Sequence, residues 1–95
     1  MVYLVAYQFM NRTAEEMKPF YETIEKFSTF VEVNRSVCLV LSGNSNADSV
    51  YDVIKSSMHA GDCLFVTALR SADQIATTDK KVRQWLGERV ESHDF

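Results

Sequence analysis

Runs of apolar residues alternate with amphipathic stretches along the chain, and their order predicts four strands and three helices. The strands are expected where β-branched and aromatic residues concentrate, at residues 2–9, 29–34, 37–41 and 63–69. Between them, and after the last strand, apolar residues recur at steps of three and four, as on one side of a helix. The order is therefore strand, helix, strand, strand, helix, strand, and one further helix.

Polar residues mark where these helices should begin. Thr13-Ala14-Glu15-Glu16 has the form of a capping box, in which a Thr side chain and a Glu side chain satisfy each other's backbone N–H groups. Pro19 conflicts with a helix that starts there, because its ring clashes with a carbonyl one turn back. Either the first turn is irregular or the regular helix begins near Lys18. Asn46 or Ser45 is expected to cap the second helix and Thr78 or Thr77 the third.

This element order predicts an α+β fold of the ferredoxin-like, β-α-β-β-α-β type, with an extra C-terminal helix. Ninety-five residues are enough for one domain, residues 1–95, and too few for two cores. In this arrangement two helices cover one face of a four-stranded antiparallel sheet, and the first and third strands lie in its middle. Those two strands are also the most apolar, as expected of strands that are covered on both faces.

The second face of the sheet is predicted to need a cover, because two helices shield only one face and the first strand is apolar on both sides. A second copy of the chain is the preferred cover, since two-fold homodimers are the commonest assemblies. The dimer interface is assigned to one side of the first strand: Tyr3, Val5, Tyr7 and Phe9. The opposite side, with Val2, Leu4 and Ala6, is the alternative. The C-terminal helix folding back, or a nucleic-acid or foreign protein surface, are other possible covers.

Composition and charge narrow the classes of function. The apolar content of 46% and the net charge of −3 exclude a disordered chain and a nucleic-acid binder driven by bulk charge. The last helix is locally basic and is the one candidate phosphate contact, through Lys80, Lys81, Arg83 and Arg89. Such basic residues more often form a solvated helix face. The N-terminus has neither the basic region nor the cleavage site of a signal peptide and is too short to cross a membrane. A cytoplasmic protein is expected.

Few residues suggest chemistry. Cys38 and Cys63 lack metal-ligand spacing and would lie on strands that are not neighbours, so two free thiols are expected and no zinc site. Asp48 and Asp52 are four residues apart on one helix face, which is typical of a cap and a solvated surface. Together with Asp62 and Asp73 they are the candidate carboxylates. No catalytic residue, metal site or cofactor is predicted from these patterns.

Short motifs in three places resemble the Cas2-like small proteins, including those called the SinR family. The first strand, Val2-Tyr3-Leu4-Val5-Ala6-Tyr7-Gln8-Phe9, is similar to that family's opening strand. The last strand is introduced by an Asp, in Gly61-Asp62-Cys63-Leu64-Phe65-Val66, and Trp85-Leu86 lies in the closing helix. The resemblance implies a ferredoxin-like homodimer and, in some members, a metal-dependent nuclease.

Position 8 departs from that family at the residue its chemistry needs. In the family an Asp ends the first strand and lies at the dimer interface, where the pair can hold a divalent cation. The matching residue here is Gln8, and a neutral amide supplies neither the anionic ligand nor the general base. The resemblance therefore implies that the dimer scaffold is retained and the catalysis is lost.

Three hypotheses follow. The preferred one is a non-catalytic, Cas2-like homodimer that recognises a protein partner, in its concrete version a phage or mobile-element inhibitor of a CRISPR-type host defence complex. The alternative is a metal-dependent endoribonuclease, as in Cas2-like or toxin-antitoxin enzymes, with carboxylates relocated to Asp48, Asp52 or Asp62. A small-molecule sensor with a ligand at the dimer cleft is the third.

Overall fold

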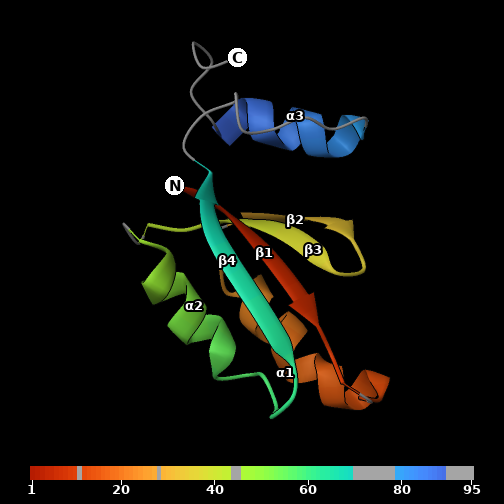
Figure 1. Cartoon of the computed structure of the whole chain (residues 1–95). Helices are drawn as coiled ribbons and strands as arrows, with labels where there is room; N and C mark the ends of the chain where they lie inside the picture. Colours follow the sequence, from red (N-terminus) through yellow and green to blue (C-terminus); the bar gives the residue numbers. More distant parts are fainter. Residues whose placement is uncertain (11, 28, 44–45, 70–78, 90–95) are drawn as a thin grey trace.

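The predicted order of elements is confirmed by the computed structural model, which describes residues 1–10, 12–27, 29–43, 46–69 and 79–89 (Figure 1). The elements are β1 (Val2–Gln8), α1 (Ala14–Glu25), β2 (Thr29–Asn34), β3 (Val37–Leu41), α2 (Ala47–Lys55), β4 (Cys63–Leu69) and α3 (Lys80–Arg89). The sequence also predicts a polar connection at 71–77 and a fraying tail at 91–95, and both lie outside the described residues. No helix of the described segments is long and apolar enough to cross a bilayer.

The four strands form one antiparallel sheet in the order β2-β3-β1-β4. The prediction that the first and third strands occupy the middle is confirmed, and the arrangement is compatible with a ferredoxin-like fold. Ala6 of β1 lies between Val37 of β3 and Phe65 of β4, which fixes the register across the three strands. Cys38 and Cys63 are both free, with β1 between their strands.

The helix starts depend on short side chains that accept backbone hydrogen bonds. The Thr13 and Glu16 side chains form the predicted capping box, and α1 runs from Ala14 through Pro19 without a break. Neither of the expected disturbances at Pro19 occurs. Pro19 lies on the solvent side of α1, so the backbone carbonyl that loses its N–H partner there can be hydrated instead.

The starts of the other two helices are set in the same way. The Asn46 side chain caps α2, accepting from the Ser49 N–H at 2.9 Å, which selects Asn46 from the two predicted caps. Apolar residues at helical spacing from Ala47 to Met58 predict a longer second helix, but α2 ends at Lys55. The Asp79 carboxylate accepts from the N–H groups of Lys81 and Val82 and so caps α3. Neither Thr77 nor Thr78, the predicted caps, lies in the described part.

The helices α1 and α2 pack together on one face of the sheet, and this placement corrects the predicted dimer interface. Tyr3, Val5 and Tyr7 point to that face and are buried in the core. Phe9, just past β1, packs against the same core. The apolar pattern of β1 could not choose between its two faces. The choice follows from volume, because the aromatic rings fill the space below α1: the Tyr7 and Phe20 ring centroids are 4.4 Å apart.

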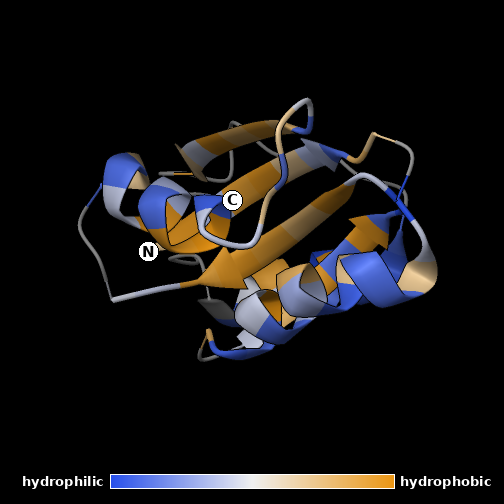
Figure 2. Ribbon diagram, turned by 90° about the horizontal axis from the view of Figure 1, so that it is seen from below, coloured by the Kyte–Doolittle hydropathy of each residue, from blue (hydrophilic) through white to orange (hydrophobic). Residues whose placement is uncertain are grey.

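The α3 helix covers one end of the opposite face, so the alternative in which the last helix folds back is observed for that end (Figure 1). Val82, Trp85 and Leu86 of α3 pack in a second apolar cluster with Val2 and Leu39 of the sheet. The Trp85 indole N–H donates to the Thr29 hydroxyl at 3.2 Å. Figure 2 shows apolar residues along the strands and polar residues on the outward sides of the helices.

Candidate interaction site

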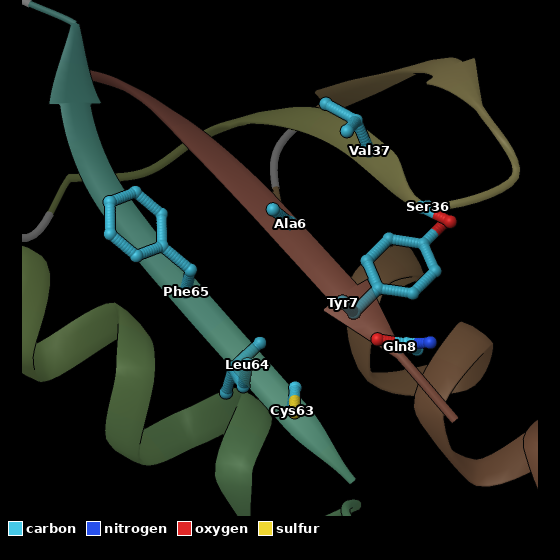
Figure 3. A pocket seen from close by; sticks show the side chains of 8 residues that line it. All are labelled: Ala6, Tyr7, Gln8, Ser36, Val37, Cys63, Leu64 and Phe65. Atoms are coloured by element: carbon cyan, nitrogen blue, oxygen red, sulfur yellow. The ribbon is translucent and has the colours of Figure 1, made fainter. Parts of the chain in front are cut away.

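The sheet face that carries α3 is left open at its other end by the described residues. We call this region the open half-face and define it by the residues that share it through the strand register: Ala6, Gln8, Val37, Cys63 and Phe65. Side chains alternate between the two faces of a strand, so these residues lie opposite the buried Tyr3, Val5 and Tyr7. Figure 3 shows them from close by, on β1, β3 and β4.

The open half-face is apolar at its centre and polar at its rim. Phe65 is 61% exposed, the largest exposure among the exposed large apolar side chains of the described residues. With Ala6 and Val37 it lines a shallow depression of about 490 Å³, whose rim includes Ser36 and Gln8. None of the residues that line this depression carries a formal charge. Such a surface suits an apolar partner surface better than a charged ligand.

Gln8 is exposed at the end of β1, where the Cas2-like resemblance would require a carboxylate. Its register neighbour on β4 is Cys63, so neither residue of this pair is acidic. Among the described residues there is no group of three or more His, Cys, Asp or Glu side chains that could hold a metal ion. Divalent cations such as Mg²⁺ need anionic oxygen ligands, and the open half-face and its rim offer the Gln8 amide, the Ser36 hydroxyl and the Cys63 thiol.

Asp62 has a structural role at the base of the site. Its carboxylate accepts from the backbone N–H groups of His59 at 2.8 Å and Met10 at 2.9 Å, and pairs with the Arg12 guanidinium at 2.8 Å. The two backbone hydrogen bonds, and then Arg12, lower the pKa of this carboxyl below its ordinary value. Its side chain is fully buried in these contacts, so it is not available to a substrate.

Arg12 completes this clamp and was not anticipated from the sequence. The guanidinium side chain is 2% exposed. It lies over the Phe9 ring, 4.8 Å from the centroid, and donates to the Glu16 carbonyl. Its Nε has no hydrogen-bond partner among the described residues. The one available signal was a single Arg in the polar break before the capping box. The clamp joins the end of β1 to the start of β4, and thereby positions Gln8 beside Cys63.

The other candidate carboxylates do not join Asp62. Asp48 lies in the first turn of α2 and Asp52 farther along the same helix, and both are exposed. Asp62 follows the opposite end of α2 and points into the clamp with Arg12. These three carboxylates therefore do not form a shared site. Asp73, the fourth candidate, lies outside the described residues.

The basic residues of α3 lie away from the open half-face, on the helix that covers the other end. Lys80, Lys81 and Arg83 are exposed, whereas the side chain of Arg89 lies outside the described residues. Lys81 borders a groove between α3 and β2 that also contains Glu32 and Glu88. Acidic and basic groups alternate there, so this surface does not offer the uniformly positive field that a nucleic-acid backbone requires.

The two thiols differ in surroundings. Burial, and secondarily the charge of Glu32, raises the pKa of the Cys38 thiol to about 12. Cys38 is 3% exposed within the helix-covered core, whereas Cys63 is exposed at the rim of the open half-face. A reagent in solution therefore meets Cys63 first.

Comparison of the chain with protein-family models, with curated proteins and with solved structures finds no match in any of the three.

Proposed function

We propose that the chain is a non-catalytic interaction protein with a Cas2-like, ferredoxin-like scaffold, which forms a homodimer and binds a protein partner. The single observation that supports it best is the open half-face, where Phe65 of the edge strand β4 is exposed and the lining residues carry no charge. Its rim carries Gln8 in place of a carboxylate. In the concrete version, a phage or mobile-element protein of this kind inhibits a host defence complex of the CRISPR type.

A cleavage assay tests the absence of catalysis. Purified protein is incubated with labelled single-stranded and double-stranded RNA in Mg²⁺ or Mn²⁺, with EDTA controls. We expect no cleavage above the control with heat-denatured protein. Metal-dependent cleavage that disappears in Asp48→Asn, Asp52→Asn or Asp62→Asn, in a variant that still folds, would overturn the proposal in favour of the endoribonuclease.

Interference measurements test the partner. A CRISPR-type complex from the native host is purified, and its target cleavage is timed with and without a stoichiometric amount of the protein. We expect slower cleavage with the wild-type chain and less slowing with Phe65→Asp, which places a charge on the apolar surface of the open half-face. Phe30→Asp is the matched control, because Phe30 is also exposed but lies on the opposite edge strand. Unchanged cleavage with the wild-type chain would contradict the host-defence version.

A further inference from the structure

The β4 strand is an edge of the sheet, and its burial is unusual for its composition. Its residues, Cys-Leu-Phe-Val-Thr-Ala-Leu, are mostly apolar, yet none of them is buried. The neighbouring β1 strand, of the same length, has four buried residues. Among the described residues no strand pairs with the outer side of β4. An apolar strand that is only half covered in one copy of the chain is a surface for a further strand.

The backbone groups that a further strand would use can be identified from the register. The Tyr7 N–H donates to the Ser36 carbonyl, on the β3 side of β1. Alternate residues of a strand direct both backbone groups to the same neighbour, so Ala6 and Gln8 face β4. Their register partners there are Phe65 and Cys63. The intervening residues of β4 therefore direct their N–H and C=O groups away from the sheet: Leu64, Val66 and Ala68.

The β4 edge lacks the features that prevent edge-to-edge pairing. It contains no charged residue and no proline, and its register with β1 has no bulge. The other edge, β2, carries exposed Glu32 and a register shift beside it, and it also contacts α3. The two edges of the sheet therefore differ. Of the two, β4 has a regular register and no charged side chain.

We propose that the β4 edges of two copies pair antiparallel across a two-fold axis at Val66, so that the two sheets become one continuous sheet. This rests on the proposed homodimer and specifies its interface. The pairing forms about six hydrogen bonds between the outward backbone groups of the two β4 strands. It sets Phe65 of each copy against Thr67 of the other, and no like charges oppose each other. Because the axis is perpendicular to the sheet, both open half-faces lie on the same side and form one larger apolar surface.

Proline substitutions test the pairing selectively. Val66→Pro removes an outward N–H that β1 does not use, a position where edge strands tolerate proline. Phe30→Pro is the matched control. Leu39 and Leu41 of β3 direct their backbone groups to β2, where their register partners are Val31 and Thr29. Phe30 lies between these two partners, so its backbone groups face away from the sheet. In light scattering at micromolar concentration we expect a dimer for the wild-type chain and Phe30→Pro, and a monomer for Val66→Pro with an unchanged far-ultraviolet spectrum.

A distance measurement keeps the test valid if either proline variant misfolds. A nitroxide label on native Cys63 reports the separation of the two β4 strands, because Cys38 is buried. Pairing centred on Val66 places the two Cys63 α-carbons about 20 Å apart, before the length of the labels is added. A dimer with another separation, or one that well-folded Val66→Pro leaves intact, overturns this interface while the homodimer stands. A wild-type chain that stays monomeric overturns both.

Discussion

At the scale of single residues, Asp62 and Arg12 organise the base of the sheet. One carboxylate accepts from two backbone N–H groups and one guanidinium, which ties the loop after β1 to the turn before β4. A buried charge of this kind is tolerated only when its partners are complete. The residue that could have been read as a catalytic acid is therefore occupied in holding two chain segments together.

Removal of the Asp62 charge should weaken the fold in a pH-dependent way. The pKa of Asp62 is lowered in the folded chain. Its contribution to the free energy of unfolding is therefore present above the unfolded pKa of about 3.9 and is lost as the pH falls through the folded pKa. Asp62→Asn leaves Arg12 without its counter-charge, and we expect a lower melting temperature at pH 7. The difference from the wild-type chain should shrink below about pH 4.

Thermal unfolding followed by circular dichroism between pH 3 and 7 measures this effect. Asp52→Asn, on the exposed side of α2, is the control and should match the wild-type chain. Equal melting temperatures of Asp62→Asn and wild type at pH 7 would show that the clamp does not stabilise the fold.

Cys38 should make the fold sensitive to alkali. Burial raises the pKa of Cys38 to about 12. Its contribution to the free energy of unfolding is therefore complete below the unfolded pKa of about 8.5 and is lost as the pH rises from there through the folded pKa. Between about pH 9 and 10 we expect the free energy of unfolding to fall more steeply in the wild-type chain than in Cys38→Val. One such group contributes a slope of about 1.4 kcal/mol per pH unit at most.

Urea titrations across this pH range give the two slopes. Cys63→Val, at the exposed thiol, is the matched control and should keep the wild-type slope. Parallel curves for wild type and Cys38→Val would rule out a linkage between Cys38 ionisation and folding.

At the scale of elements, α3 decides how much of the second sheet face remains open. It is held by three buried apolar side chains that pack on β1, β2 and β3, and by the hydrogen bond from Trp85 to Thr29. In α3, as in the other helices, most of the stability comes from the packing of one apolar side rather than from helix propensity.

Truncation of Leu86 should therefore loosen this helix. Leu86 is 1% exposed, and Leu86→Ala is expected to lower the free energy of unfolding by about 2–4 kcal/mol. Trp85 is the single tryptophan of the chain, so its fluorescence should shift to longer wavelength as the helix separates from the sheet. Gly87→Ala is the control in the same helix. The added methyl group meets nothing within 4 Å and should stabilise by about 0.5–1 kcal/mol. An unshifted spectrum and unchanged stability in Leu86→Ala would contradict this packing.

At the scale of the whole molecule, the stability of one copy and the association that we propose for it rest on different residues. The core beneath α1 and α2 and the cluster beneath α3 hold the single chain together. The open half-face contributes little to that, because Phe65 and Cys63 remain exposed to water, whereas Leu64, Val66 and Ala68 of β4 pack against the core. An exposed apolar residue gains free energy only when something covers it.

Phe65→Thr should separate the two properties. With 61% of Phe65 exposed, the free energy of unfolding of the monomer should change by no more than about 0.5 kcal/mol. The dissociation constant of the dimer should rise about tenfold or more, since a tenfold change needs only about 1.4 kcal/mol. Sedimentation equilibrium and urea unfolding measure the two. Phe30→Thr, at the other edge, should leave the dissociation constant unchanged, and a large loss of monomer stability in Phe65→Thr would contradict the separation.

The sequence alone was sufficient for the elements and their order. Three features are local signals, because each depends on residues close together in the chain: the β-branched runs, the Thr13 capping box and the polar residues 34–36, which favour a hairpin turn between the second and third strands. The order of elements, with the apolar character of the first and third strands, also gave the strand order of the sheet. Gln8 was recognisable as a neutral residue at the position where the Cas2-like resemblance would require a carboxylate.

Only the tertiary structure decided which side of each strand faces which layer. Tyr3, Val5 and Tyr7 turned towards the helices, against the prediction, because both sides of β1 are apolar and only the filling of space below α1 distinguishes them. The Arg12–Asp62 clamp joins residues fifty positions apart, and α3 covers only one end of the second face. These are long-range contacts, set by how the layers pack, and no local pattern in the chain contains them.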